Sequence, residues 1–293
     1  MPLVSGTEIL QAARKGGYAV GAYNTNNLEW TQAILAAAEA KQAPVLIQTS
    51  MGAAKYMGGY KLVVHMVTDL MESMNITVPV AIHLDHGSYE AALECIEAGY
   101  TSVMFDGSHL PFEENLKLAK DVVEKAHAKG ISVECEVGSI GGEEDGIIGS
   151  GELADIDECV QMVGTGIDFL ACGIGNIHGA YPENWTGLAF DHLQAISDAV
   201  SAAAGREVPL VLHGGSGIPV EQIQKAISMG VSKVNVNTEF QVSFAKATRE
   251  YIEAGKDLEG KGFDPRQLLA AGKAAIIKDA EEHIEIFGSA NKA

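Results

Sequence analysis

Residues 78–87 read Val-Pro-Val-Ala-Ile-His-Leu-Asp-His-Gly, and the interpretation of the whole chain starts from this stretch. Its apolar part is typical of a short buried β-strand that opens at Pro79. The strand ends in Asp85, His86 and Gly87, and a carboxylate beside an imidazole is costly to bury unless a metal ion, a partner or a substrate compensates it. Adjacent residues on a regular strand face opposite ways, so both can reach one substrate only if the strand bends. We expect that bend at Gly87.

Similar short apolar segments alternate along the chain with segments of helical periodicity. The eight predicted strands cover residues 19–24, 44–50, 78–87, 102–107, 131–138, 168–175, 209–214 and 233–238. The predicted helices between them cover residues 27–42, 60–74, 90–98, 111–129, 156–163, 192–203 and 219–229. This alternation predicts an α/β fold, a closed (β/α)8 TIM barrel. A doubly wound open sheet is the alternative, but no Gly-x-Gly-x-x-Gly pattern follows the first strand to support it.

The C-terminal part of the chain exceeds what a barrel needs. No linker or change of composition interrupts the 293 residues, so we expect a single barrel domain over residues 1–293. A helix is predicted over residues 239–254, and residues 255–293 form a C-terminal helical extension. We expect this extension to pack on the barrel wall or on a second subunit of a homodimer or homotetramer.

The charge balance excludes several classes of partner. Lysine and arginine total 20 against 39 aspartates and glutamates, a formal net charge of −19 that repels nucleic acid and anionic membrane surfaces. The four cysteines have no paired spacing of the zinc-ribbon or redox type and are interpreted as reduced thiols. Because no leader-like N-terminus and no membrane-spanning apolar run are present, we expect a cytoplasmic protein.

Polar residues gather at the predicted C-terminal ends of the strands, the face that carries the active site in such barrels. The first four strands end in Asn24, Ser50, Asp85 with His86, and Asp106. On the fifth strand Glu134 and Glu136 lie two apart and hence on one face. Both are expected to point into the barrel, because its outer face must meet apolar helices.

Three histidines occupy matching positions in this pattern. His86, His178 and His213 lie at the same end of the third, sixth and seventh strands, and three neutral imidazoles with an open fourth position are typical of a catalytic zinc ion. The alternative is that each is an unrelated surface or capping residue, which three matched positions disfavour. His83 lies deeper in the third strand and is interpreted as a core histidine with its own hydrogen-bond partner.

Two loops have the composition of a phosphate site. Gly214, Gly215 and Ser216 lead into a helix that opens at Pro219, and residues 235–238 likewise precede a helix. Two helix N-termini that converge after the seventh and eighth strands predict a phosphate site built from backbone amides.

Residues 138–151 form a glycine-rich, acidic segment after the fifth strand. Such a segment is not expected to pack well. It is either an exposed, solvated loop or a mobile lid that brings a carboxylate to the substrate.

These motifs together resemble the class II, metal-dependent fructose-bisphosphate aldolases, from Val20 nearly to the C-terminus. The similar motifs are His-Leu-Asp-His-Gly at 83–87, Glu-Val-Gly at 136–138 with Gly-Gly-Glu-Glu-Asp at 141–145, Asn-Ile-His-Gly at 176–179, Leu-His-Gly-Gly-Ser-Gly-Ile-Pro at 212–219 and Asn-Val-Asn-Thr-Glu at 235–239. The short spacing before Glu143 and Glu144 is more similar to the shorter subclass, which includes tagatose-bisphosphate aldolases. The resemblance implies reversible, zinc-dependent cleavage of fructose 1,6-bisphosphate to dihydroxyacetone phosphate and glyceraldehyde 3-phosphate in glycolysis and gluconeogenesis. Cleavage of tagatose 1,6-bisphosphate is the alternative.

The resemblance also implies a role for each polar residue. Zn²⁺ would be bound by His86, His178 and His213, while Asp106 and Glu136 would hold a second divalent metal ion or an alternative position of the first. Asp85 would be the proton-transferring acid/base, and Glu144 would handle the proton at the carbon beside the carbonyl. The dihydroxyacetone phosphate half of the phosphosugar would meet Gly179, Gly214, Gly215, Ser216, Asn235, Val236, Asn237 and Thr238. Ser50 and Asn24 would meet the aldehyde half, and Arg266 would reach the distal phosphate in a neighbouring subunit.

The chain departs from the family pattern at one place. Many relatives carry Pro-Tyr-Lys after the strand-six His-Gly, whereas this chain continues Gly179-Ala180-Tyr181-Pro182. A lysine expected at the substrate phosphate is therefore absent. Backbone amides and a monovalent cation, Na⁺ or K⁺, are expected to carry more of the phosphate affinity.

The residues also decide between two kinds of aldol chemistry. Breaking a carbon–carbon bond beside a ketone needs an electron sink, either a Schiff-base lysine or a Lewis-acid metal ion. No lysine ends a predicted strand, and Lys233 begins one, so the metal route is favoured. A metal-dependent hydrolase on the same barrel is an alternative, but residues 20–24 lack the His-x-His pair that such barrels often carry. A phosphosugar-binding barrel without turnover is a further alternative, which the three histidines disfavour.

Overall fold

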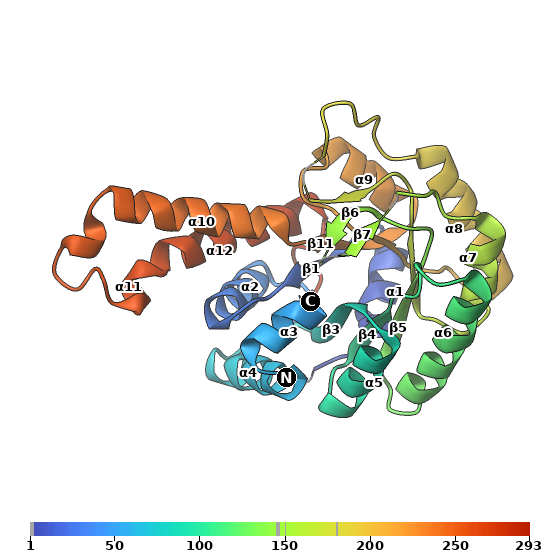
Figure 1. The fold of residues 1–293 in the computed structure, drawn as a ribbon, viewed down its shortest axis with the longest axis horizontal. Coiled ribbons are helices and arrows are strands. Elements are labelled where there is room, and N and C mark those ends of the chain that lie inside the picture. The colour runs from blue at the N-terminus through green and yellow to red at the C-terminus, as the bar shows by residue number, and fades with distance from the viewer. Residues whose placement is uncertain (1–2, 145–146, 150, 180) are drawn as a thin grey trace.

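Eight parallel strands close into a barrel in the computed structural model, which describes residues 3–144, 147–149, 151–179 and 181–293 (Figure 1). Around the barrel the strands follow the order β1 (Val20–Asn24), β11 (Val231–Val236), β10 (Leu210–Leu212), β8 (Phe169–Cys172), β5 (Ser132–Val137), β4 (Ser102–Phe105), β3 (Val80–Gly87) and β2 (Val45–Thr49). The barrel closes between β1 and β11, with Val20 opposite Lys233. The predicted (β/α)8 TIM barrel is confirmed.

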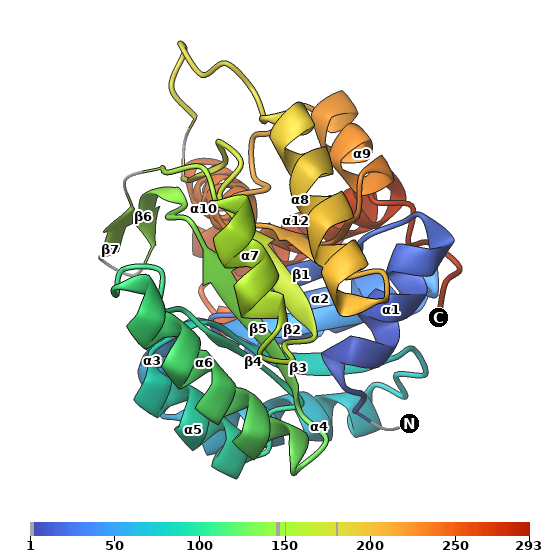
Figure 2. The ribbon, with the colours of Figure 1, turned by 90° about the vertical axis from the view of Figure 1, so that its right-hand side faces the viewer.

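Helices surround the strands (Figure 2). They are α2 (Leu28–Lys41), α4 (Tyr60–Ser73), α5 (Tyr89–Ala98), α6 (Phe112–His127), α7 (Ile156–Val163), α8 (Phe190–Ala204), α9 (Val220–Ser228) and α10 (Thr238–Glu253). Several begin at a side-chain cap; Asn27, Ser88 and Asp155 each accept a hydrogen bond from a backbone N–H of the first helical turn. Within the described ranges, no helix combines the length and the apolar character that crossing a bilayer requires.

Two helices were not predicted. The first, α1 (Gly6–Gly16), covers the N-terminal end of the barrel: a Cβ on Gly6 would lie 2.8 Å from Ser132 Oγ, and Leu10 is fully buried beside Val20 and Phe169. The second, α3 (Met51–Met57), follows β2 directly. Helix α3 has only seven residues and lies between the predicted strand 44–50 and the predicted helix 60–74.

The eighth strand starts earlier than predicted. It runs from Val231 to Val236 rather than over residues 233–238, and all six of its residues are buried. Lys233 is therefore the third residue of the strand, not its first, and lies in the barrel interior with no exposed surface.

Residues 138–151 contain a β-hairpin, so this segment has regular structure that the sequence did not predict. Strand β6 (Gly141–Glu144) pairs antiparallel with β7 (Ile147–Gly149) and parallel with β9 (Ile177–His178). Residues 145, 146 and 150 lie outside the described residues. The hairpin is thus hydrogen-bonded to the strand that carries His178.

The C-terminal segment forms an arm, here defined as residues 238–286. It consists of α10, the short η1 (Lys256–Leu258), α11 (Pro265–Leu268) and α12 (Ala270–Ile286). Helix α12 packs against both α10 and α2, while the tip of the arm projects away from the barrel (Figure 1). At this tip Leu258 is 84% exposed and Phe263 69% exposed.

Candidate metal centre

The tip of β3 bends, but one residue earlier than predicted. His86 has a φ of 46°, in the left-handed region that non-glycine residues rarely adopt, and the pairing of β3 with β4 shifts register between Leu84 and Gly87. Gly87 serves a different purpose. A Cβ there would lie 2.3 Å from Leu84 Cδ2 and 2.7 Å from the Met104 carbonyl oxygen, so glycine lets β4 approach closely.

The imidazole of His86 lies between two groups of metal-ligating side chains. Its Nε2 is 2.8 Å from His213 Nδ1, and its ring centre is 4.8 Å from that of His178. Its Nδ1 is 2.8 Å from Asp106 Oδ2 and 3.9 Å from Glu136 Oε2. In each group of three, one ligand atom per residue lies within 4.8 Å of the others. The structure therefore brings all five predicted metal ligands together.

The donor set fits a divalent cation. Imidazole nitrogens and carboxylate oxygens are the ligands that zinc and similar ions take in proteins. Among the described residues, buried Glu136 Oε2 has no hydrogen-bond partner, while Oε1 accepts only the Ile140 N–H at 3.3 Å. A buried carboxylate oxygen without a donor is unusual, and a metal ion would satisfy it.

The electrostatics of the three imidazoles differ. Burial lowers the pKa of His178 to about 3, and the charges of His86 and His213 add to this effect. Burial likewise lowers the pKa of His213. At His86, burial is outweighed by the hydrogen bond to Asp106 and by nearby carboxylates, which raise its pKa to about 10. Burial and the charge of Asp106 raise the pKa of Glu136 well above its ordinary value. Two of the imidazoles are therefore neutral at pH 7, and a cation entering the site must displace the proton on His86.

Three side-chain amides surround the carboxylate of Asp85. Asn24 Nδ2 donates to Oδ2 at 3.0 Å, Gln48 Nε2 donates to Oδ2 at 3.1 Å, and Asn235 Nδ2 donates to Oδ1 at 3.0 Å. Sequence reasoning missed Gln48, although a glutamine inside the apolar segment 44–50 is a signal that could have found it. The amides fix the Asp85 carboxylate at the mouth of the barrel as a hydrogen-bond acceptor.

A second polar layer lies deeper in the barrel. Both glutamates of β5 are buried, Glu136 at the candidate metal centre and Glu134 in this deeper layer. Glu134 Oε1 is 2.8 Å from His213 Nε2, and Lys233 Nζ donates to Glu134 Oε2 at 2.8 Å. His83 contacts Ser102 Oγ at 2.7 Å and Lys233 Nζ at 3.3 Å. The interpretation of His83 as a core histidine with partners is confirmed.

A cleft opens beside the imidazoles at the ends of β1, β9, β10 and β11. It is lined by Asn24, Asp85, His178, Gly179, Gly214, Ser216, Asn235, Asn237 and Thr238. Gly214 has a φ of 63°, and a Cβ there would lie 2.1 Å from the Ile177 carbonyl oxygen. Only glycine therefore fits at this position, where the β9 and β10 segments meet.

The loops around this cleft are fastened to each other. The Gly215 N–H donates to the Asn235 carbonyl at 3.0 Å, so this amide already has a partner. Ser216 Oγ accepts the Glu239 N–H at 3.3 Å. The Tyr181 hydroxyl, missed by sequence reasoning, donates to the Gly214 carbonyl at 2.8 Å and accepts the Ile177 N–H at 3.1 Å. Its signal was weak, because one tyrosine in an irregular loop has no pattern.

The remaining predicted site residues lie at the ends of three strands and on the arm. Ser50 is buried at the end of β2, where it caps α3 by accepting the Ala53 N–H at 3.2 Å. Val236 ends β11 and is buried, and it is not among the residues that line the cleft. Glu144 ends β6, but its side chain lies outside what the structure describes. Arg266 is paired with Asp264 and belongs to α11, at the tip of the arm that projects away from the barrel (Figure 1).

Comparisons with known proteins agree with this geometry. The family model for class II fructose-bisphosphate aldolase matches residues 4–292. The chain is 68% identical to a fructose-bisphosphate aldolase of Streptococcus pneumoniae serotype 4, strain ATCC BAA-334 / TIGR4, with 100% of both chains covered. It is 52% identical to that of Mycoplasma pneumoniae, with 99% of this chain and 100% of the other covered. Among solved structures, the YdjI aldolase of Escherichia coli K12 matches with a TM-score of 0.84 and 33% identity, covering 100% of both chains. The chain therefore belongs to the class II fructose-bisphosphate aldolase family.

Proposed function

We propose that the chain catalyses the reversible, zinc-dependent aldol cleavage of fructose 1,6-bisphosphate into dihydroxyacetone phosphate and glyceraldehyde 3-phosphate. The observation that carries this proposal is the convergence of three imidazoles and the amide-bound carboxylate of Asp85 at one mouth of the barrel. The relatives at 66–68% identity carry the name fructose-bisphosphate aldolase over their full length, which supports fructose rather than tagatose bisphosphate as the substrate.

In this proposal His86, His178 and His213 hold Zn²⁺, and Asp106 and Glu136 hold a second divalent ion or an alternative position of the first. A metal ion held by these residues would supply Lewis acidity to the substrate ketone and to the negative charge that develops as the carbon–carbon bond breaks. A Schiff-base route lacks a candidate here. Lys233 is fully buried and ion-paired with Glu134, and no lysine lines the cleft among the residues the structure describes.

Two carboxylates move protons. Asp85 takes the proton of the hydroxyl on the carbon that becomes the aldehyde, and returns it in the direction of synthesis. Its amide partners keep the carboxylate oriented toward the cleft. Glu144, carried on β6, handles the proton at the carbon beside the carbonyl. The pairing of β6 with β9 supports this role, because it places the hairpin next to His178.

The cleft residues bind the phosphosugar. The dihydroxyacetone phosphate half meets Gly179, Gly214, Gly215, Ser216, Asn235, Val236, Asn237 and Thr238. Helices α9 and α10 begin beside these residues, so their N-termini favour an anion. Na⁺ or K⁺ bound nearby would add positive charge that the missing lysine does not supply. Asn24 and Ser50 meet the aldehyde half.

Arg266 completes the site of a neighbouring copy. Its side chain is 85% exposed on the projecting arm, so it can reach a substrate phosphate only in another subunit. We therefore place the chain in a homodimer or homotetramer. The role of its family in glycolysis supports a cytoplasmic location.

Chelation tests the metal dependence directly. Triose phosphate release from fructose 1,6-bisphosphate should fall to background after treatment with a strong chelator and return when Zn²⁺ is added back. Turnover that persists after chelation, in protein without bound zinc, would sink the proposal. Tagatose 1,6-bisphosphate assayed in parallel should be cleaved more slowly, and the reverse order would reassign the substrate.

A further inference from the structure

Glu134 occupies a place directly behind the candidate metal centre. One carboxylate oxygen is 2.8 Å from His213 Nε2 and the other is 2.8 Å from Lys233 Nζ. The side chains of these three residues have no exposed surface. Neither Glu134 nor Lys233 lines the substrate cleft, so their role must be exerted through His213.

The direction of each hydrogen bond follows from the chemistry of the partners. Ionised Glu134, paired with Lys233, can only accept, so His213 Nε2 carries the proton. The other ring nitrogen, Nδ1, then has a free lone pair. It faces His86 Nε2 at 2.8 Å, and the Asn235 amide nitrogen, which can only donate, lies 3.1 Å from it. Two independent neighbours therefore assign the same tautomer, with the lone pair directed at the metal centre.

Lys233 offsets the cost of burying the ionised Glu134 carboxylate. A buried carboxylate without a counter-charge is strongly unfavourable, whereas the Glu134–Lys233 pair is neutral overall. His83 Nε2 lies 3.3 Å from both Lys233 Nζ and Glu134 Oε2, so it can accept from the ammonium or donate to the carboxylate. Its Nδ1 is 2.7 Å from Ser102 Oγ, a hydroxyl that can accept from or donate to either tautomer.

We propose that Glu134 and Lys233 are positioning residues for the metal centre: Glu134 fixes the tautomer and ring orientation of His213, and Lys233 holds Glu134 in place. This inference rests on the proposed metal site. Carboxylates that orient a ligating imidazole in this way usually contribute about 10- to 100-fold to metal affinity.

A pair of double variants isolates the hydrogen bond from the charge. E134Q/K233M keeps a neutral acceptor for His213 Nε2, and its amide NH₂ can donate to His83 Nε2, which lies 3.3 Å from Glu134 Oε2 in the parent protein. E134L/K233M has the same charge and a similar volume but offers no acceptor. Full-length metal-free protein of each variant is titrated with Co²⁺, and its dissociation constant and visible spectrum are compared with those of the parent.

We expect E134L/K233M to bind Co²⁺ about 10- to 100-fold more weakly than E134Q/K233M, with a shifted spectrum, although both metal-free variants melt at similar temperatures. Equal affinities and spectra in the two double variants, whether near the parent or both weak, would overturn the proposal. Should E134L/K233M fail to fold, E134D keeps both charges but withdraws the acceptor from His213; parent-like Co²⁺ binding by this variant would also overturn it. A parent protein that binds Co²⁺ yet cleaves no bisphosphate would refute the proposed reaction and leave the positioning result standing.

Discussion

Asp85 is the residue on which the proposed proton transfer depends. Burial alone would raise its pKa, but the charges of His86, His213 and Lys233 and the hydrogen bond from Asn24 outweigh burial and lower it. The carboxylate is consequently ionised at neutral pH and ready to accept a proton. Because three amides hold the carboxylate in place, its proposed role relies on its position.

Replacing Asp85 by alanine should lower kcat for fructose 1,6-bisphosphate by about 10²- to 10⁴-fold, since a general acid/base contributes on this scale. The imidazoles are unchanged, so the variant should keep its metal. Steady-state kinetics and metal content measured on the same preparation check both statements. Asp121→Ala, which removes a partly exposed carboxylate from α6, is the control and should turn over normally. Undiminished turnover in the Asp85 variant would remove this residue from the mechanism.

At the scale of single residues, sequence patterns predicted the positions of polar residues that recur along one strand or at the same end of several strands. The histidines at three strand ends and the two glutamates of β5 followed from strand periodicity alone. The bend did not, because a left-handed conformation at a histidine leaves no compositional signal, while Gly87 beside it is the residue type that usually marks one. Strain of about 1–3 kcal/mol at His86 is the local cost of directing its ring to the metal centre.

Among the elements, β6 connects the hairpin to the metal centre. Gly142 is paired with His178, has a φ of 88°, and a Cβ on it would lie 2.1 Å from the His178 carbonyl oxygen. Any side chain would push the two strands apart. The position of the hairpin and the position of a proposed metal ligand are therefore set by the same contact.

Gly142→Ala should lower kcat by about 10²-fold, because a displacement on the scale of 1 Å near reacting groups has effects of this size. The matched control is Gly205→Ala, at a position with a φ of 63° and no atom within 4 Å of the added Cβ. That variant carries the backbone strain without the clash, so its kcat should match the parent. The two variants need to be compared by kinetics and by thermal melting; equal kcat values would contradict the coupling.

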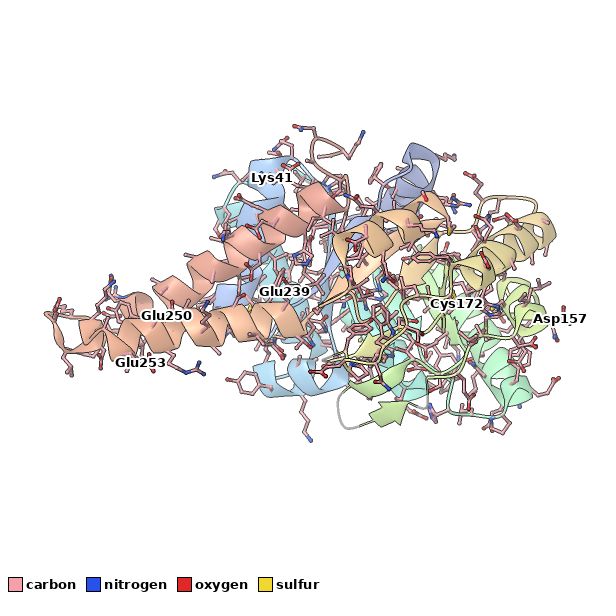
Figure 3. The ribbon with its side chains drawn as sticks, turned by 90° about the horizontal axis from the view of Figure 1, so that it is seen from above. Lys41, Asp157, Cys172, Glu239, Glu250 and Glu253 are labelled. Carbon is pink, nitrogen blue, oxygen red and sulfur yellow. The ribbon has the colours of Figure 1, made fainter. Side chains whose placement is uncertain are left out.

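Helices α10 and α12 are joined by a titratable pair. His283 Nε2 on α12 lies 3.3 Å from Glu239 Oε2 at the start of α10, the end of that helix nearest the barrel (Figure 3). Burial lowers the pKa of His283, but the hydrogen bond and charge of Glu239 outweigh it and raise the pKa above the ordinary 6.5. The hydrogen bond from His283 lowers the pKa of Glu239 below 4.5.

These directions set the pH window of the pair. The contribution of His283 is fully present below pH 6.5 and is lost as the pH rises through its folded-state pKa, whereas that of Glu239 is present above pH 4.5 and is lost as the pH falls through its own. The stability lost between about pH 5.5 and about pH 8.5 should be smaller in His283→Gln than in the parent. The difference should not exceed about 1 kcal/mol, because solvent screens the half-exposed Glu239. Urea unfolding at the two pH values measures this difference, with exposed His65→Gln as the control. If the free energy of unfolding changes equally between the two pH values in His283→Gln and in the parent, the pair does not contribute to stability.

At the scale of elements, the sequence predicted the barrel strands because each is a short, buried, apolar run. The hairpin in residues 138–151 escaped because glycine and acidic residues dominate it, and its stability comes from pairing with β9 rather than from its own composition. The early start of β11 was not predicted, for a related reason. Ser232 and Lys233 look like turn residues, yet both are fully buried and have hydrogen-bond partners.

For the molecule as a whole, the arm is the feature that the barrel does not need. It carries Glu250 and Glu253 toward its far end and Arg266 at its tip, beyond the reach of the cleft in the same chain (Figures 1 and 3). Exposed Leu258 and Phe263 accompany Arg266 there, a combination suited to contact with another protein surface.

Arg266→Ala should raise KM for fructose 1,6-bisphosphate about tenfold or more, because a hydrogen bond to a charged group contributes about 1.5–3 kcal/mol. Its kcat should change little. Arg249→Ala, which removes another exposed arginine of the arm, should leave KM unchanged. Sedimentation of both variants checks that the assembly persists. If the two variants share the KM of the parent, Arg266 does not contact substrate in a neighbouring subunit.

The closure of the barrel between β1 and β11 has a consequence for the protein during its synthesis. Asp85 receives hydrogen bonds from Asn24, 61 positions before it, and from Asn235, 150 positions after it. A ribosome releases the chain in order, and contacts over such separations form late in folding. In the nascent polypeptide the proposed proton acceptor therefore lacks part of its hydrogen-bond shell until β11 has emerged and docked against β1. Catalytic activity in this protein would therefore indicate that the barrel has closed.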